Sequence, residues 1–203
     1  MLSQTAFIPK TPTIASRRIA ILIADGFDLT QVTAVRAALS AQSALPFIIG
    51  SRRGHIKCST QSTLEDSQET GLGADYSWEN ARSTLFDAIY VPGGAQSALT
   101  MRESGRAVHW VREAFHHCKA IGASGEGVDF IHQVCQLPGI NLAIKPNDTS
   151  VVTDNGVVTV GKFETSTELK AKFGGTDFVS QFVTEISKHR CWERGALAAK
   201  VPA

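Results

Sequence analysis

The chain has 203 residues, of which 43% are hydrophobic, and its formal net charge is +1. A chain of this length and composition supports one sizeable core, so a single domain is expected. The scattered, nearly balanced charge argues against a nucleic-acid partner or a membrane surface. No apolar run approaches the roughly 18 residues that a membrane span needs, and residues 1–4 lack the basic start of a signal peptide. We therefore expect a soluble protein, cytoplasmic or secreted depending on any segment upstream of residue 1.

The cysteines do not form a metal or redox motif, because none lies within four residues of another. We expect reduced, structural thiols, and Cys58 is the one that we most expect to be exposed. An even number of cysteines leaves disulfides open if the protein is secreted, so the sequence does not fix the redox state. The four residues are Cys58, Cys118, Cys135 and Cys191.

Residues 1–16 are predicted to be an extended arm or linker. They contain Pro9 and Pro12, and the residue before a proline is pushed toward extended geometry. A chain that starts with a linker is typical of a piece of a larger protein. We expect the folded domain to cover residues 17–195 and a frayed tail to cover residues 196–203.

In the first half of the chain, apolar runs alternate with helical patterns. The Asp25-Gly26 pair ends the first run, and Asp28 is a suitable N-cap for the helix that follows. Residues 54–63 are expected to form a hairpin or a loose loop. The predicted strands cover residues 18–24, 46–50 and 86–91, and the predicted helices cover residues 28–42 and 103–118.

In the second half, a strand over residues 120–123 leads through a sharp turn at Ser124 into a helix over residues 128–134. Residues 151–160 form a hairpin around Asn155-Gly156, residues 161–172 give no clear pattern, and an amphipathic helix covers residues 176–190. Strands that alternate with helices predict an α/β, flavodoxin-like fold. Its open, mostly parallel sheet has helices on both faces and a hairpin near the C-terminal part.

Ser124 is the candidate nucleophile, because turns at the carboxyl ends of parallel strands form the crevice where ligands and nucleophiles sit. The hydrolase elbow needs glycine two positions before and two after the serine; Gly122 fits, but Glu126 does not. A serine also needs a base, and His132 lies eight residues on, too far along the helix to reach it. We favour a small residue at a tight turn and keep a catalytic serine as the alternative.

The Gly93-Gly94 turn has two interpretations: it presents backbone N–H groups to an anion or an oxyanion, or it simply needs positive φ. The loop over residues 25–30 lacks a glycine-rich phosphate cradle, which argues against bound FMN. No metal-binding spacing is present, so no metal or cofactor is expected. Three aspartates are interpreted as turn or cap residues and three tryptophans as packing residues: Asp148, Asp154, Asp177, Trp78, Trp110 and Trp192.

Several motifs together resemble the PfpI-like superfamily, which has the class I glutamine amidotransferase-like fold. They are Ile19-Ala20-Ile21-Leu22-Ile23-Ala24-Asp25-Gly26-Phe27-Asp28, Asp87-Ala88-Ile89-Tyr90-Val91-Pro92-Gly93-Gly94, the Ser124 turn and the hairpin of residues 151–159. Active members carry a cysteine at the position of Ser124, often a histidine at that of Gly125, and an acidic residue at that of Gln31. A thiolate needs stabilising charge, so the resemblance implies the fold with a degenerate site and without protease or deglycase activity.

The segment of residues 7–20 also resembles the junction that leads into the C-terminal domain of large-subunit haem catalases, of a fungal kind. This resemblance implies a non-catalytic domain, with haem and hydrogen peroxide breakdown in an upstream part. Neither tyrosine follows an arginine in the family's haem-ligating Arg-x-x-x-Tyr pattern, since Leu72 precedes Tyr76 and Phe86 precedes Tyr90 at that spacing.

The roles implied are stabilising the parent homotetramer, shaping access to the haem, and holding unfolded client proteins like the superfamily's stress chaperones. Such a holdase needs exposed apolar surface. The alternatives are a PfpI-like or serine hydrolase that uses Ser124 with the Gly94 amide as oxyanion donor, and a module that binds a small anion at Gly93-Gly94.

Overall fold

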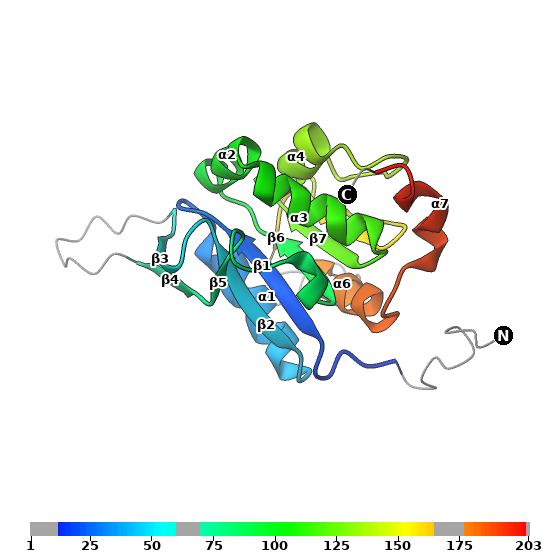
Figure 1. Cartoon of the computed structure of the whole chain (residues 1–203), viewed down its shortest axis with the longest axis horizontal. Helices are drawn as coiled ribbons and strands as arrows, with labels where there is room; N and C mark the ends of the chain where they lie inside the picture. Colours follow the sequence, from blue (N-terminus) through cyan, green and yellow to red (C-terminus); the bar gives the residue numbers. More distant parts are fainter. Residues whose placement is uncertain (1–11, 60–69, 165–176, 202–203) are drawn as a thin grey trace.

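The computed structural model describes residues 12–59, 70–164 and 177–201 (Figure 1). Its centre is a seven-stranded sheet in the order β5-β2-β1-β6-β7-β9-β8, and all neighbouring pairs are parallel except β8 with β9. The chain passes from β1 through α1 to β2 on one side of β1 and later returns to β6 on its other side, and this reversal of direction opens a crevice at the carboxyl ends. The strands are β1 Arg18–Ile23, β2 Leu45–Gly50, β5 Tyr76–Ser77, β6 Ala88–Val91, β7 Ala120–Ser124, β8 Val151–Asp154 and β9 Val157–Val160.

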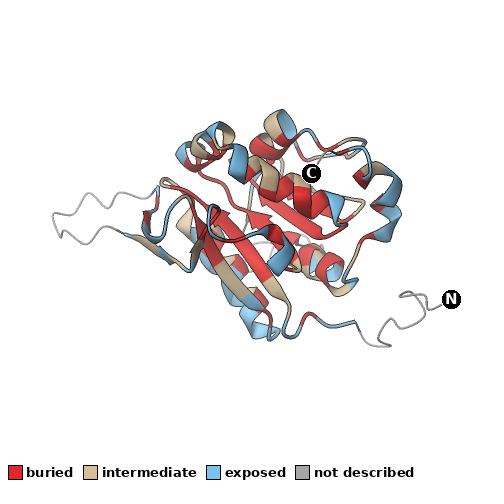
Figure 2. Ribbon diagram, in the orientation of Figure 1, coloured by how far each residue is buried: buried red, intermediate tan, exposed pale blue. Residues whose placement is uncertain are grey.

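Helices cover both faces of this sheet, as expected for a parallel sheet whose central strands are mostly apolar (Figures 1 and 2). One core cluster joins the sheet to α1 and α6, and the other joins it to α2, α3 and α4. The helices and helical turns are α1 Leu29–Ala41, η2 Ser83–Leu85, α2 Ala95–Glu103, α3 Gly105–His116, α4 Glu126–Phe130, η3 Ile131–Cys135, α6 Phe178–Ser187, η4 Trp192–Arg194 and α7 Gly195–Ala198.

The main sequence predictions for the sheet and its helices are confirmed. Asp28 caps α1 by accepting a hydrogen bond from the backbone N of Gln31, and Asp177 caps α6 in the same way. The hairpin β8–β9 turns at Asn155 (φ 47°) and Gly156 (φ 79°), the two positive φ values that an Asn-Gly turn supplies. The α/β, mostly parallel fold is therefore confirmed.

The helix predicted over residues 103–118 is wrong at its start, because two helices occupy this region. α2 ends at Glu103, and Ser104 then caps α3 by accepting from the backbone N of Ala107. The polar sequence of α2 gives it little amphipathic signal, so the pattern showed only the second helix. The serine before Gly105 is the signal that marks the boundary.

Two other segments differ from the predictions. Residues 54–57 form strand β3 (Gly54–Lys57), whose antiparallel partner is the more distant β4 (Gly71–Ala74); residues 60–63 of the predicted hairpin lie outside the described residues. The helix after Ser124 starts earlier than expected and continues as a π turn until Gln136 (φ 49°) ends it. Of the unclear segment at 161–172, residues 165–172 lie outside the described part.

Both ends of the domain pack more closely than the sequence suggested. Ile14, assigned to the linker, is 2% exposed and joins the core cluster under α1. At the other end, Ala198 and Val201 are buried, so the described part of the expected frayed tail is folded onto the domain. The apolar side chains at 14 and 201 belong to the domain's packing rather than to flanking segments.

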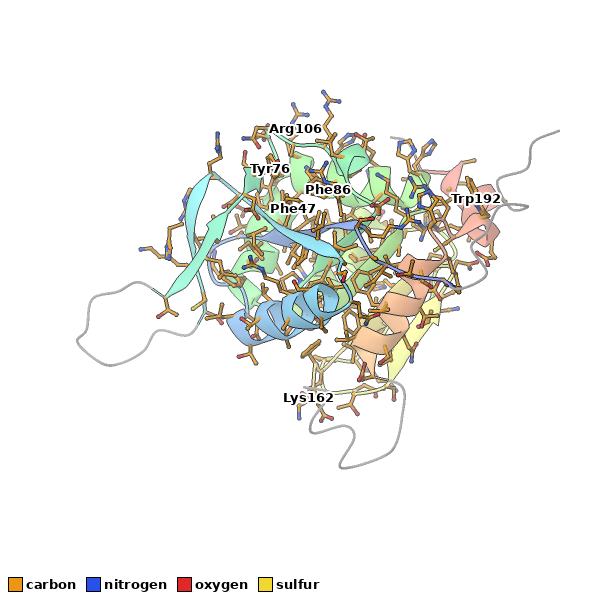
Figure 3. All side chains as sticks on the ribbon, turned by 90° about the horizontal axis from the view of Figure 1, so that it is seen from below. Phe47, Tyr76, Phe86, Arg106, Lys162 and Trp192 are labelled. Atoms are coloured by element: carbon orange, nitrogen blue, oxygen red, sulfur yellow. The ribbon has the colours of Figure 1, made fainter. Side chains whose placement is uncertain are left out.

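The cysteine and tryptophan predictions are partly wrong. All four cysteines are buried and free, so the expected exposure of Cys58 is wrong, although its 8% is the largest value among them. Trp78 and Trp110 pack in the core, but Trp192 is 52% exposed and lies at the end of the molecule where α7 packs (Figure 3). The hydrophobicity of Trp192 could not show which side of η4 it occupies.

Candidate functional site

The fold brings the candidate residues together at the carboxyl edge of the central strands. Ser124 is the last residue of β7 and is followed by Gly125. Gly93 and Gly94 follow β6, and Gln31 lies in the first turn of α1. All of these segments meet where the loops after β1, β6 and β7 converge, which is the ligand-binding edge of such folds.

Ser124 is buried at this edge and is not accessible to solvent. Its side chain is 0% exposed. Its Oγ lies 2.7 Å from Oη of Tyr90 and donates to Oε1 of Gln31 at 2.6 Å. The tyrosine hydroxyl therefore donates to the serine, which in turn donates to the glutamine.

The amide groups of the Gly93-Gly94 turn are occupied by the chain's own side chains. The N–H of Gly93 donates to Oε1 of Gln31 at 2.8 Å, and that of Gly94 donates to Oε2 of Glu126 at 2.9 Å. Gln31 is itself held by its Nε2, which donates to Oδ2 of Asp28 at 3.0 Å. An oxyanion or a bound anion would have to displace both side chains from the turn.

Close backbone contacts explain the glycines here. Gly94 has φ 122°, and a Cβ built on it would lie 2.3 Å from the carbonyl oxygen of Gly26. Gly125 has φ 54° and passes close to Gly93. Positive φ at these two positions favours glycine without any ligand, so a structural reason for the pattern stands beside the binding interpretation.

No general base contacts Ser124 among the residues described. Its hydrogen-bond partners are Tyr90 and Gln31, and burial raises the pKa of Tyr90 far above its ordinary value. His132 lies on the exposed π turn, and His116 and His117 lie at the C-terminal end of α3, before β7 begins. A serine becomes a nucleophile when a neighbouring base takes its proton, and neither of its two partners, Tyr90 and Gln31, is such a base.

Sequence reasoning missed two members of this cluster, Tyr90 and Glu126. Tyr90 was treated as part of an apolar strand, although a tyrosine in a fully buried strand needs a polar partner for its hydroxyl. Glu126 was noted only as a departure from the hydrolase elbow. An acidic residue in the first turn of a helix, next to a glycine turn, is a signal that it accepts from nearby N–H groups.

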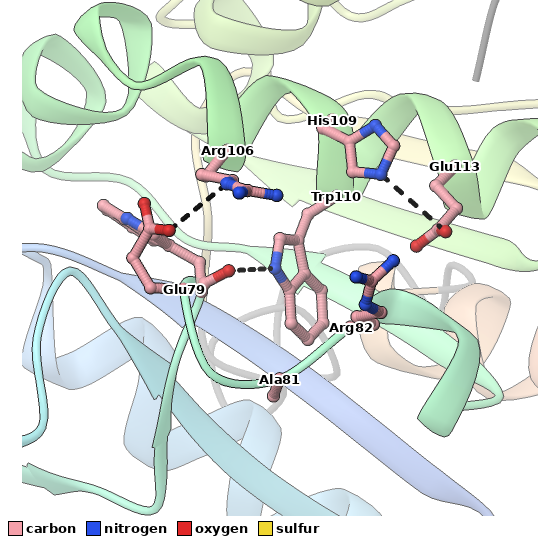
Figure 4. A pocket seen from close by; sticks show the side chains of 8 residues that line it. Glu79, Ala81, Arg82, Arg106, His109, Trp110 and Glu113 are labelled. Carbon is pink, nitrogen blue, oxygen red and sulfur yellow. Dashed lines mark hydrogen bonds and ion pairs between the residues drawn. The ribbon is translucent and has the colours of Figure 1, made fainter.

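A separate small cavity of about 70 Å³ lies between α3 and the segment that precedes η2 (Figure 4). Its walls contain both basic and acidic side chains. Nε of Arg106 lies 3.2 Å from Oε2 of Glu79, and Nε2 of His109 lies 3.8 Å from Oε1 of Glu113. The indole of Trp110 donates to the carbonyl oxygen of Trp78 at 3.1 Å. This cavity contains none of the residues around Ser124.

Within residues 12–59, 70–164 and 177–201, no group of three or more His, Cys, Asp and Glu side chains could hold a metal ion. The described helices include none that is long and apolar enough to cross a membrane.

The fold is similar to that of solved DJ-1-like α/β structures. DJ-1beta of Drosophila melanogaster aligns with a TM-score of 0.66 at 18% identity and covers 91% of this chain and 96% of its own. DJ-1 of Toxoplasma gondii, in an oxidised form, aligns with a TM-score of 0.65 at 14% identity and covers 91% of this chain and 95% of its own. Identities this low show the fold alone.

The sequence comparisons are more specific. Residues 15–196 match the model of the C-terminal domain found in long catalases, and the chain belongs to this family. It is 43% identical over 196 residues to Catalase-1 of Neurospora crassa and 41% identical over 197 residues to Catalase A of Aspergillus fumigatus. The alignments cover 95% of this chain but only 25% and 26% of those proteins, so the chain spans about a quarter of the length of these relatives.

Proposed function

We propose that this chain is a catalytically silent domain of a large-subunit haem catalase, and that the preceding part of that protein breaks down hydrogen peroxide. The observation that carries the silent role is the closure of Ser124, which is 0% exposed and bonded to Tyr90 and Gln31. The family match and the fungal catalases among the relatives support the parent.

The two tyrosines of this chain do not fit the role of a haem ligand, so we assign haem to the preceding part of the parent. Tyr90 is fully buried against Phe178 and Phe182, with its hydroxyl at Ser124. Tyr76 packs in an aromatic group with Phe47 and Phe86, at ring-centroid distances of 6.1 and 6.4 Å (Figure 3). Neither phenol is free to approach an iron atom.

The proposed role of the domain is to stabilise the parent oligomer and shape access to its haem. Leu45 is 48% exposed at the start of β2, and Leu85 is 51% exposed just before β6. Both lie at the edge of the sheet formed by the amino ends of the parallel strands. The segment that leads into β1 reaches the sheet at this same edge. Apolar side chains at that edge are suited to packing against a preceding domain.

Truncation of the parent tests this role. A parent catalase lacking the residues that correspond to 15–203 should form a less stable oligomer. The measurement is sedimentation velocity at falling protein concentration, together with the temperature at which peroxide breakdown is lost. An unchanged tetramer with unchanged heat resistance would contradict the stabilising role.

A holdase activity is the finer part of the proposal. Besides Leu45 and Leu85, the exposed large apolar side chains of the described residues include Leu99, Ile144 and Trp192. They are distributed over several elements, which favours weak, multipoint contact with an unfolded chain. The test is light scattering of a heat-labile enzyme, with the domain at equimolar ratio and without ATP. Suppressed scattering supports the role; scattering equal to that with an unrelated globular protein removes it.

A serine hydrolase is the second candidate, favoured only by the position of Ser124 next to the Gly93-Gly94 turn at the carboxyl edge. It requires Gln31 and Tyr90 to release the hydroxyl and Glu126 to release the Gly94 amide. Turnover of an activated ester that is lost in Ser124→Ala would support it. A small-anion module at the same turn would instead raise the melting temperature in phosphate or sulfate more than in an equal ionic strength of chloride.

A further inference from the structure

Cys118 and Cys191 lie next to each other although they are far apart in the chain. Cys118 is in the turn between α3 and β7, and Cys191 is in the turn between α6 and η4. The backbone N of Cys191 donates to the carbonyl oxygen of Cys118 at 2.7 Å. With standard covalent geometry, that bond holds the two Cα atoms within about 6.5 Å of each other, inside the range of roughly 4.4–6.8 Å that disulfides span.

The two thiols also face one buried guanidinium. Arg194 is 0% exposed and lies over the ring of Phe115, 4.4 Å from the ring centroid. Its Nη1 and Nη2 donate to the carbonyl oxygens of Asn155 and Lys119, and its charge acts on the thiols of both Cys118 and Cys191. The Nε of Arg194 is buried and has no hydrogen-bond partner among the described residues.

Gly156 leaves the space that Cys191 occupies. A Cβ built on Gly156 would lie 2.1 Å from Sγ of Cys191 and 3.5 Å from Nη1 of Arg194. On its other side, Sγ of Cys191 donates to Oε2 of Glu185 at 3.7 Å. The thiol of Cys191 therefore has a proton acceptor in Glu185, and position 156 has no room for a side chain.

We propose that Cys118 and Cys191 are a dithiol site that a peroxide oxidises to a reversible disulfide. The other cysteines, Cys58 and Cys135, belong to separate core clusters under the sheet. The pairing is selective because only these two thiols share a backbone hydrogen bond and a guanidinium. The disulfide would fasten the C-terminal segment, η4 and α7, to the start of β7.

The reaction balances with a peroxide as the only oxidant. The sulfur of Cys118, which is 5% exposed while Cys191 is 0% exposed, attacks one peroxide oxygen. The O–O bond breaks, and the leaving oxygen takes the thiol proton to form water, or an alcohol from an alkyl peroxide. Cys191 then attacks the sulfenic acid at Cys118; Glu185 accepts the thiol proton and passes it to the departing hydroxide, which leaves as water. The two thiols lose two electrons and the peroxide gains them.

Burial sets the expected rate. Desolvation raises the pKa of the Cys191 thiol to about 12, so its thiolate is scarce at neutral pH and the second step depends on proton transfer to Glu185. A thiol of this kind reacts slowly compared with an exposed one. The disulfide is therefore expected to accumulate over long exposure to peroxide rather than in a fast catalytic cycle.

The test is a peptide map of the folded 203-residue chain after incubation with hydrogen peroxide. After the remaining thiols are blocked, trypsin should release the peptide of residues 113–119 joined to that of residues 191–194. The titratable thiols should fall from four to two, and dithiothreitol should restore them. The oxidised protein should melt about 5–10 °C higher, since the link constrains a long loop of the unfolded chain.

Variants separate the pairing from unspecific oxidation. Cys191→Ser should abolish the linked peptide, whereas Cys58→Ser and Cys135→Ser should keep it. If a variant fails to fold, the peptide map of the wild-type chain still tests which cysteines are linked. The proposal is overturned if the folded protein keeps four thiols under conditions that oxidise the same chain in urea. It is equally overturned if the linked peptides contain Cys58 or Cys135, or if Cys118 is found only as sulfinic acid.

Discussion

The hydroxyl of Ser124 donates to Oε1 of Gln31 at 2.6 Å, and this same oxygen accepts the N–H of Gly93 at 2.8 Å. A glutamine thus joins the serine at the turn after β7 to the glycine turn after β6. In a hydrolase those two groups would face a substrate from two sides. Here both groups donate to the side chain of Gln31, so they have hydrogen-bond partners without a ligand.

Ser124→Ala is expected to lower the free energy of unfolding by about 1–3 kcal/mol, because it leaves the buried hydroxyl of Tyr90 without its partner. Urea unfolding followed by circular dichroism measures the change. Ser187→Ala is the matched control. It removes a hydroxyl that donates to the carbonyl oxygen of Thr184 in an exposed hydrogen bond, and its effect should stay within about 0.5 kcal/mol. Equal effects of the two changes would show that the Ser124 bridge adds no stability.

Gly94→Ala should destabilise the domain by more than about 2 kcal/mol. The residue has φ 122°, and the new Cβ would lie 2.3 Å from the carbonyl oxygen of Gly26. Gly105→Ala serves as the control, because a Cβ there meets nothing within 4 Å. Alanine at that helical position should raise stability by about 0.5–1 kcal/mol. The comparison is made by thermal melting, and a neutral Gly94→Ala would contradict the tight contact between the two loops.

The sequence was sufficient to predict the sheet and the helices on its two faces, because the central strands are mostly apolar and because Asp28 and Asn155-Gly156 are local signals of a helix cap and a turn. It was insufficient where the decisive contacts are made between distant residues. The polar bridge from Tyr90 through Ser124 to Gln31 joins three separate elements. The local pattern shows that a buried tyrosine needs a polar partner, but not which residues supply the bridge. The burial of Ile14 likewise depends on its place under α1, whereas its neighbours Pro12 and Thr13 have the composition of a linker.

Lys119 predicts an unusual pH dependence. It is 2% exposed and donates through Nζ to the carbonyl oxygen of Ser83. Burial, with a contribution from Arg190, lowers the pKa of Lys119 from 10.5 to about 8. Between pH 8 and 10.5 the unfolded chain therefore binds more protons at this residue than the folded one, and the free energy of unfolding should rise with pH.

The measurement is the difference in stability between the wild type and Lys119→Met from pH 7 to pH 10.5, which cancels the titration of other groups. The Lys119 contribution should grow by an amount on the order of 2 kcal/mol over this range. Loss of the hydrogen bond to Ser83 adds a constant to the difference in stability and does not affect how that difference changes with pH. A difference that stays constant with pH would show that the amine keeps its ordinary pKa in the folded protein.

Ile14→Ala should lower the free energy of unfolding by about 2–4 kcal/mol, because a side chain that is 2% exposed in the core cluster leaves a cavity. Thr13→Ala, at an exposed neighbouring position, is the control and should change stability by less than about 0.5 kcal/mol. Chemical denaturation of both variants decides whether the segment before β1 is part of the folded unit. If Ile14→Ala leaves the free energy of unfolding unchanged, Ile14 belongs to the linker and not to the folded unit.

The most direct test of the silent site is reaction with a fluorophosphonate, which forms a covalent adduct with activated serines. The folded chain is incubated with the probe beside a known serine hydrolase, and the intact masses are measured. We predict that the hydrolase is labelled and that this chain keeps its mass, because Ser124 is buried and bonded to Tyr90 and Gln31. A stoichiometric adduct on Ser124 that is absent from Ser124→Ala would contradict the account and identify a working nucleophile.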